Sequence, residues 1–188
     1  NSDGSDSIQG QGGKKAAAAG SSSSSSNKAS IIDIEAPTEP FRVELELLLD
    51  RHDPSSTAKV VVEVIPEWAP LGATQFKKLV VNGFYDNCRI FRVVPKFMSQ
   101  FGISGTPGGG SKWKQAIKDD QQNVELTQGN IRGSITFAMS GKNSRTTQLF
   151  INSVNNNFLD KQGFTPFGRV LEGMEHWDAV NKQYGEKP

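Results

Sequence analysis

The chain has 188 residues, 35% of them hydrophobic, and its 21 Lys and Arg residues nearly balance 20 Asp and Glu residues, for a formal net charge of +1. This balance, without any basic run, argues against nucleic acid as a partner, and no apolar run approaches the roughly 18 residues of a membrane span. The single cysteine, Cys88, excludes an intrachain disulfide bond.

The first 30 residues have low sequence complexity, with a glycine-rich stretch, alanines at 16–19 and serines at 21–26. Such a segment buries too little apolar surface to offset the entropy lost on folding. We therefore expect residues 1–38 to form a disordered tail or linker and residues 41–188 to form one folded domain. The chain begins at Asn1, so a removed targeting peptide would leave no trace, and the compartment stays open between the cytoplasm and an organelle lumen.

Two strands are predicted at the start of the folded domain. In Val43–Leu49, apolar residues alternate with glutamates, which is the pattern of a half-buried strand. The segment Lys59–Ile65 is rich in β-branched residues and follows a turn-rich loop, so we expect it to pair antiparallel with the first strand.

A helix should follow these strands. Pro70 suits a first helical turn, and the turn signal Asn82-Gly83 suits a helix end. The residues expected on the apolar face of this helix are Leu71, Phe76, Leu79 and Val80.

The segment Phe91–Gln100 places two polar side chains among apolar ones. It is predicted to form two short strands joined by a proline, and side chains alternate faces along a strand. Arg92 should share a face with Val94, and Met98 should share a face with Gln100. A guanidinium is always protonated, so Arg92 can only donate hydrogen bonds. Taken alone, an arginine in such a segment is more often an exposed residue on an edge strand.

The glycine-rich segment from Gly102 to Glu125 is predicted to be a loop. Its Ser111-Lys112 pair has the reverse of the order that a phosphate-binding loop requires, so a nucleotide site is not expected.

Two further strands, Gly133–Met139 and Gln148–Asn152, flank a polar turn. By the period of two, Gln148 and Phe150 lie on one face, although Phe150 alone could be an ordinary core residue. A second helix is expected over residues 172–184, with its apolar face formed by Met174, Trp177 and Val180.

The order Arg92-Val93-Val94-Pro95-Lys96-Phe97-Met98-Ser99-Gln100 resembles the signature of the cyclophilin-type peptidyl-prolyl isomerases, Arg-(Val/Ile)-(Val/Ile)-Pro-x-Phe-Met-x-Gln. Three other segments are similar to the family in the same order: Gly83-Phe84-Tyr85-Asp86, Gln148-Leu149-Phe150-Ile151 and Phe158-Leu159-Asp160, the last followed by Phe167-Gly168-Arg169-Val170.

This resemblance implies a mainly β fold, namely a closed eight-stranded antiparallel β-barrel capped by two α-helices. It covers residues 41–188 and lacks the family's last strand, because the sequence stops at Pro188. An unpaired strand edge is an aggregation hazard, so we expect the domain to be incomplete at its C-terminus.

The resemblance also implies a function: peptidyl-prolyl cis-trans isomerisation of Xaa-Pro bonds in protein substrates, assisting folding, without metal or cofactor. Arg92 would be the catalytic donor and Gln100 would orient it. The residues implied in substrate binding are Phe97, Met98, Ala138, Met139, Gln148, Phe150, Phe158, Leu159 and Phe164. The expected partners are proline-containing peptides or proteins, bound by a monomer.

Several positions depart from the family. Phe91 stands where a histidine is usual, Met139 where an asparagine is usual and Phe164 near the usual pocket histidine. Phe158 stands where many members carry tryptophan, which implies a reduced affinity for cyclosporin-type inhibitors. These departures leave an alternative open, a catalytically weak module that binds proline-containing peptides.

Overall fold

The computed structural model describes residues 30–50 and 52–180. Most of the tail expected at 1–38, and the end of the helix expected at 172–184, therefore lie outside the described residues. Residues 30–39 contain no helix or strand. The backbone of Ile32 is nevertheless paired with the side-chain amide of Asn82, which accepts from the Ile32 N–H at 2.7 Å and donates to its carbonyl at 2.9 Å.

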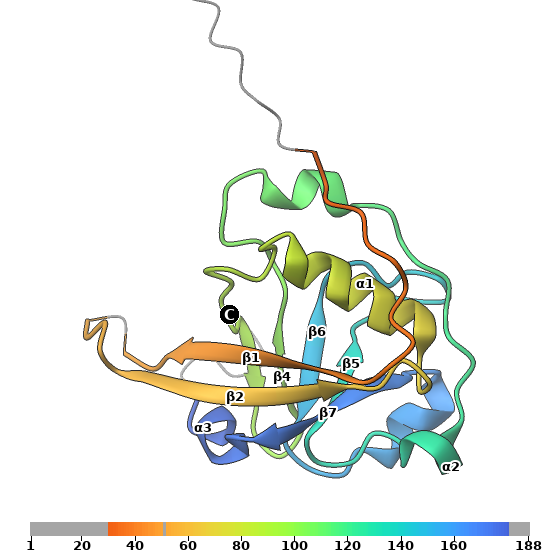
Figure 1. Cartoon of the computed structure of the whole chain (residues 1–188). Coiled ribbons are helices and arrows are strands. Elements are labelled where there is room, and N and C mark those ends of the chain that lie inside the picture. The colour runs from red at the N-terminus through yellow and green to blue at the C-terminus, as the bar shows by residue number, and fades with distance from the viewer. Residues whose placement is uncertain (1–29, 51, 181–188) are drawn as a thin grey trace, which may run out of the picture. The chain divides into compact units, whose positions relative to one another are not determined.

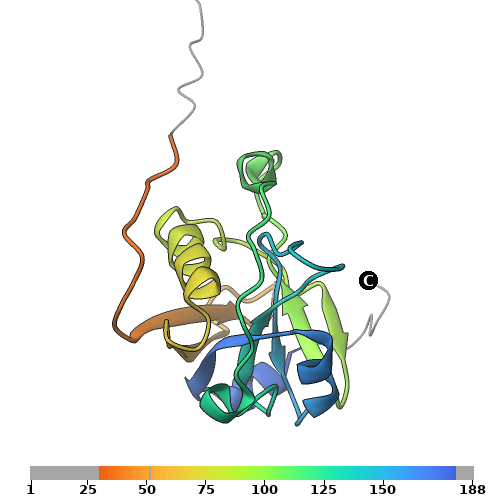
Figure 2. The same ribbon diagram turned by 90° about the vertical axis from the view of Figure 1, so that its right-hand side faces the viewer.

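A curled antiparallel sheet of seven strands forms the framework of the described residues, in the order β1-β2-β7-β5-β6-β4-β3. Figures 1 and 2 show that it curves into a half-barrel rather than lying flat. The mainly β prediction is therefore confirmed. The strands are β1 (Phe41–Leu48), β2 (Thr57–Val64), β3 (Arg92–Val94), β4 (Met98–Phe101), β5 (Ser134–Phe137), β6 (Leu149–Asn152) and β7 (Pro166–Glu172).

The hairpin of β1 and β2 follows from the alternation in the sequence. Phe41 pairs with Val64 and Leu48 with Thr57 in an unbroken antiparallel register, as predicted. The face of β2 that carries Val60, Val62 and Val64 is completely buried. Leu49 lies beyond the end of β1 and is 44% exposed, so its assignment to the strand was wrong.

Helix α1 (Pro70–Val81) begins and ends where the sequence indicated, at Pro70 and before Asn82. It packs across the sheet, and the ring of Phe76 lies 5.1 Å from that of Phe167 on β7. Leu71 was wrongly placed on the apolar face. It is 44% exposed, because the buried face is formed by Gly72, Ala73, Phe76 and Leu79.

The other helices are short: the 3-10 helices η1 (Gly109–Trp113) and η2 (Asn157–Gln162), and the α-helices α2 (Val124–Thr127) and α3 (Met174–Asp178). The segment expected to be a loop thus contains η1 and the start of α2, and both views show η1 standing away from the sheet (Figures 1 and 2). Helix α3 begins later than predicted because Glu172 ends β7. Its Trp177 is almost fully buried and contacts Phe101, with 5.6 Å between the ring centroids.

Two apolar clusters lie on the sheet. The larger one joins β2, α1, β5, β6 and β7, and the smaller one consists of Met98, Phe150 and Leu159. None of the helices in the described part of the chain has the length and apolar character needed to cross a bilayer.

We predict that Gly168→Ala destabilises the domain. Gly168 of β7 pairs with Val64 of β2. A Cβ at position 168 would overlap the carbonyl oxygen of Glu63 and lie 3.1 Å from the Cα of Val64. Such overpacking against backbone should lower the free energy of unfolding by about 1–3 kcal/mol or more in urea denaturation. Gly110→Ala is the matched control, because no atom lies within 4 Å of its added Cβ. Equal stability of the two variants would contradict this account of the β2–β7 contact.

Candidate functional site

A pocket of about 180 Å³ opens where the short strands β3, β4 and β6 meet η2. We call it the β4–β6 pocket. It is lined by Arg92, Phe97, Met98, Gln100, Ala138, Met139, Phe150, Leu159 and Phe164. All nine were among the residues singled out from the sequence, so the fold brings them together from three separate segments.

Strand register explains why these side chains converge. Arg92 is directly opposite Gln100 in the β3–β4 pair, and Gln100 is directly opposite Phe150 in the β4–β6 pair. Residues that are directly opposite in antiparallel strands project from the same face. The turn between β3 and β4 is tight, with a positive φ of 59° at Lys96, so both strands stay in register up to the turn. The predicted sharing of a face by Met98 and Gln100 holds, because both line the pocket.

A row of hydrogen bonds forms one edge of the β4–β6 pocket. The Nη1 atom of Arg92 donates to Oε1 of Gln100 at 3.2 Å, and Nε2 of Gln100 donates to Oε1 of Gln148 at 2.8 Å. We call these three side chains the polar row. Because Gln148 accepts from the amide nitrogen of Gln100, the amide oxygen of Gln100 is left to face Arg92. The row thus fixes the direction of a permanently charged guanidinium at the pocket edge.

The floor of the pocket is apolar. Met98, Phe150 and Leu159 are each at most 5% exposed. Phe164 meets Phe150 nearly edge-on, with 5.7 Å between centroids and an interplanar angle of 72°. A small aliphatic ring would therefore find an apolar floor beside one charged donor, the usual composition of a small-ligand site.

Two of the predicted residues border the pocket without lining it. Gln148 is the end of the polar row, as described above. Phe158 is 53% exposed and stacks on Phe97, with 5.8 Å between centroids and an interplanar angle of 24°. The stacked pair extends the apolar surface outward from the pocket.

A buried asparagine hub behind the pocket was missed in the sequence. The Nδ2 atom of Asn130, a completely buried residue, donates to Oδ1 of Asp160 and to the carbonyl of Phe164, both at 2.7 Å. Its Oδ1 accepts from Thr136 Oγ1 at 3.0 Å and from Asn152 Nδ2 at 3.2 Å. Asn130 therefore connects the segment that contains Asp160 and Phe164 to strands β5 and β6.

Asn156 connects the same hub to the β3–β4 turn. The Nδ2 atom of Asn156 donates to the carbonyl of Phe97 at 2.9 Å and to Oδ1 of Asn152 at 2.7 Å. Its backbone carbonyl also accepts from the N–H of Leu159 at 2.9 Å. The sequence gave little signal for these roles, because a run of asparagines at 155–157 is typical of an exposed turn.

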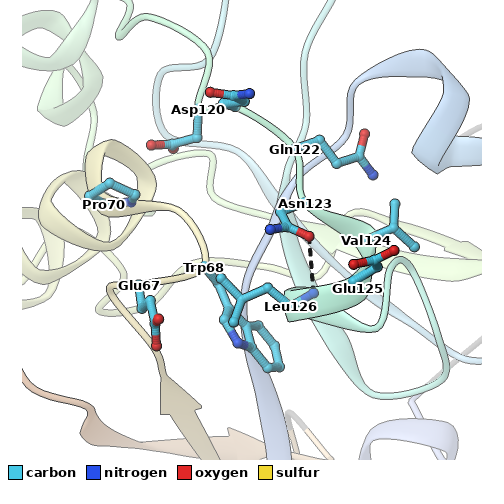
Figure 3. Close-up of a pocket in the computed structure, with 10 residues that line it drawn as sticks. Glu67, Trp68, Pro70, Asp120, Gln122, Asn123, Val124, Glu125 and Leu126 are labelled. Atoms are coloured by element: carbon cyan, nitrogen blue, oxygen red, sulfur yellow. Dashed lines mark hydrogen bonds between the residues drawn. The ribbon is translucent and has the colours of Figure 1, made fainter.

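A second, larger hollow of about 660 Å³ lies between the β2–α1 corner and α2 (Figure 3). Its lining is mostly exposed and polar, and it includes the carboxylates of Glu67 and Glu125. Asn123 accepts from the N–H of Leu126 at 3.1 Å and so caps α2. The described residues that line this hollow include no arginine or lysine, and they form no apolar floor comparable to that of the β4–β6 pocket. We therefore assign the candidate site to the smaller pocket.

Comparison with known proteins identifies the family. The family model described as cyclophilin type peptidyl-prolyl cis-trans isomerase/CLD matches residues 53–188. The peptidyl-prolyl cis-trans isomerase of Acinetobacter baylyi is 32% identical over 131 residues, covering 67% of this chain and 68% of the relative. Peptidyl-prolyl cis-trans isomerase A of Dickeya dadantii is 34% identical and covers 68% of each. The mouse peptidyl-prolyl cis-trans isomerase-like 3 is 32% identical, covering 65% of this chain and 76% of the relative.

The fold is similar to that of a solved structure, a cyclophilin type peptidyl-prolyl cis-trans isomerase of Cryptosporidium parvum. The TM-score is 0.59 at 20% sequence identity, covering 79% of this chain and 91% of that one. The chain of the same protein crystallised in the presence of the dipeptide Ala-Pro gives a TM-score of 0.57 at 22% identity, over 70% and 85% of the two chains.

The chain therefore belongs to the cyclophilin-type peptidyl-prolyl cis-trans isomerase family, as the sequence motifs indicated. Its activity is the cis–trans isomerisation of Xaa-Pro peptide bonds.

We predict that Asn130→Ala lowers stability through the loss of the asparagine hub. The substitution removes the side-chain amide that binds Asp160, the Phe164 carbonyl, the Thr136 hydroxyl and Asn152. Asp160 keeps the N–H of residue 130 and the amide of Gln122, and Asn152 keeps Ser134. A buried group left without any partner costs about 1–3 kcal/mol, and the Thr136 hydroxyl and the Phe164 carbonyl are the groups most affected. Urea denaturation should therefore show a loss of several kcal/mol. Asn157→Ala, at an exposed asparagine of the same region, should stay within about 0.5 kcal/mol of the wild type. A small effect at Asn130 would mean that the hub adds little to the pocket wall.

Proposed function

We propose that Arg92 is the residue that accelerates isomerisation, by donating a hydrogen bond to the prolyl nitrogen as the peptide bond twists. Rotation about a peptide bond is opposed by about 18–20 kcal/mol, because resonance gives the C–N bond partial double-bond character. When that resonance is lost, the nitrogen becomes pyramidal and gains a lone pair that can accept a hydrogen bond. A donor aimed at this lone pair interacts with the transition state and not with the planar ground state, so it lowers the barrier.

The observation that supports this role is the placement of Arg92 at the edge of the β4–β6 pocket. Its Nη1 is directed by Gln100, which is itself held by Gln148, so the guanidinium is oriented before substrate arrives. The pocket beside it, about 180 Å³ in volume, takes the prolyl ring. In this proposal Phe97, Met98, Phe150, Leu159 and Phe164 hold the ring by apolar contact, and Phe158 extends that contact at the rim.

The substrate backbone would lie along residues 138–139. The N–H of Ala138 already donates to the carbonyl of Gln148 at 2.9 Å, as a continuation of the β5–β6 pairing. The contact with peptide would then come from the other main-chain groups of Ala138 and Met139. A main-chain contact is indifferent to the side chain, so the methionine at position 139 is compatible with it.

We also propose that the domain is a closed eight-stranded barrel with a helix over each end, acting as a monomer. This proposal is supported by the incomplete burial of β1, which lies at the edge of the sheet. Its inward side chains pack against the core but are only partly buried: Phe41, Val43, Leu45 and Leu47. A further strand beside β1 would complete their burial and remove an exposed edge.

Arg92→Ala should lower kcat/KM for a short Xaa-Pro peptide by about 10²–10³-fold, the usual effect of removing one transition-state donor. NMR exchange spectroscopy, or an assay coupled to a protease specific for the trans isomer, measures this rate. Arg89→Ala removes an exposed cation three residues away and should leave the rate unchanged. Wild-type rates in the folded Arg92→Ala variant, or peptide binding by the wild type without any acceleration, would each refute the proposal.

We expect Phe158→Trp to tighten binding of cyclosporin A. Phe158 occupies the position at which many members of the family carry tryptophan, and it is exposed at the pocket rim, where an indole fits without disturbing the core. An indole adds an N–H donor that phenylalanine lacks, and one hydrogen bond contributes about 1 kcal/mol, or about five-fold in Kd. Isothermal titration calorimetry on both proteins tests this. Equal or weaker binding by the tryptophan variant would show that position 158 does not limit inhibitor affinity.

A further inference from the structure

The turn from Ser140 to Thr147 leads directly into Gln148 of the polar row, yet it contains no helix or strand of its own. Its main chain is fixed instead by groups from elsewhere in the fold. The carbonyl of Arg145 accepts from the N–H of Ile117 at 2.9 Å, and the carbonyl of Thr146 accepts from the side chain of Gln75 at 3.0 Å. Three successive carbonyls are held in this way, since that of Thr147 accepts from the hydroxyl of Tyr85, also at 3.0 Å.

The side chain of Arg145 anchors this turn from inside the protein. It is 3% exposed, and its Nη1 donates to Oδ2 of Asp120 at 2.9 Å. Its Nη2 donates to the carbonyl of Lys118, and its guanidinium lies over the ring of Phe137, 5.9 Å from the centroid. Burying a charged guanidinium costs free energy unless several groups bind it, and losing one of those groups is strongly destabilising. The turn is therefore most stable in the one geometry that keeps all of these contacts.

Asp120 joins the same arginine to the first turn of α1. Its Oδ1 accepts from the N–H of Leu71 at 2.8 Å, and its Oδ2 accepts from the N–H of Gly72 at 2.9 Å. Figure 3 shows the carboxylate of Asp120 directed toward Pro70, where α1 starts. The carboxylate thus satisfies two N–H groups that have no partner within the helix and also meets the positive end of the helix dipole. We call Asp120 and Arg145 the clamp.

The clamp leaves little space around it. A Cβ at Gly72 would lie 3.3 Å from Nη1 of Arg145 and 3.3 Å from Oδ2 of Asp120, closer than most such contacts. The hydroxyl of Tyr85 is held by its bond to the carbonyl of Thr147. Loss of hydration raises the pKa of Tyr85 well above the usual value of 10, so the hydroxyl stays protonated and remains a donor. The turn before Gln148 is therefore rigidly attached to α1 and to the segment that carries Asp120.

From these contacts we propose that Asp120 and Arg145 are positioning residues for the isomerase, acting through Gln148 and Gln100 on Arg92. When the turn is displaced, Oε1 of Gln148 moves away from Nε2 of Gln100. The Gln100 amide is then free to turn, and its oxygen no longer holds Nη1 of Arg92. This inference rests on the proposed role of Arg92. It adds a second requirement, namely that Asp120 and Arg145, acting through other residues, keep its guanidinium in one orientation.

The test is Arg145→Lys, which keeps the positive charge near Asp120 but loses the planar group that binds Asp120 and Lys118 together. We expect kcat/KM to fall about 10-fold or more, mainly in kcat, because a misdirected catalytic group loses transition-state stabilisation more than binding. The signals of the Gln100 side-chain amide in ¹H–¹⁵N spectra should shift as well. Arg132→Lys is the control for losing a guanidinium outside this network. Arg132 also binds a carboxylate and a carbonyl, those of Asp178 and Ser153, although its ion pair is partly exposed and that of Arg145 is buried.

A double-mutant cycle separates positioning from stability. In the Arg92→Ala background, Arg145→Lys should change the residual rate by less than about two-fold, because the group being positioned is already gone. Wild-type kcat/KM in Arg145→Lys, or a loss that is the same with and without Arg92, would overturn the proposal. If Arg145→Lys does not fold, the same cycle with Tyr85→Phe decides, since that change removes only the hydroxyl that holds Thr147. Failure of the proposed role of Arg92 would be evident separately, as full activity of Arg92→Ala alone.

Discussion

The hydrogen bond between Arg92 and Gln100 orients the guanidinium, the one charged side chain among the described residues that line the pocket. The surrounding polar contacts preserve this bond. A guanidinium on a short edge strand would otherwise sample many rotamers, because arginine has a long and flexible side chain. Here the bond from the amide nitrogen of Gln100 to Gln148 keeps the amide oxygen of Gln100 turned toward Arg92. A three-residue row thus converts a mobile cation into an oriented donor.

Two polar networks support this row and the pocket from different sides. The asparagine hub around Asn130 holds the carbonyls of Phe97 and Phe164 and so fixes the apolar floor. The clamp of Asp120 and Arg145 holds the turn that delivers Gln148. Both networks are buried, where hydrogen bonds are strong and an unpaired group is costly, so each favours a single arrangement of the elements it joins.

Local sequence patterns predicted the features that are set by residues close in the sequence, namely the faces of strands and the ends of helix α1. The period of two placed Met98 and Gln100 on one face, and both line the pocket. Pro70 and the turn signal after Val81 predicted both ends of α1. The mistaken placement of Leu71 on the apolar face has a local cause. At about 100° per residue, Leu71 lies roughly 140° around the helix from Phe76, whose ring packs against Phe167 of β7, so its side chain faces away from the sheet.

The supporting networks were not predictable in this way, because their partners are distant in the sequence. Asp120 and Arg145 lie in segments that look like solvent-exposed loop, and a carboxylate beside a helix start 48 residues away leaves no periodic signal. Asn130 likewise stands among turn-forming residues. Family resemblance predicted the residues that line the pocket, but it gave no information on which contacts orient them.

The chemistry explains why orientation is so important in this enzyme. No covalent bond is made or broken in isomerisation, so the protein has no nucleophile to activate and no proton to transfer. In the proposed mechanism it contributes an apolar surface for the prolyl ring and one donor placed where a lone pair appears in the twisted state. Phe158 and Phe164 differ from the residues usual in the family, but both belong to the apolar contact surface and neither belongs to the polar row. These differences therefore leave the proposed donor and its supporting bonds unchanged. If the proposed roles hold, binding of proline and acceleration of its isomerisation are separable in this fold. Binding would then depend on the apolar floor held by the asparagine hub, and acceleration on the polar row held by the clamp.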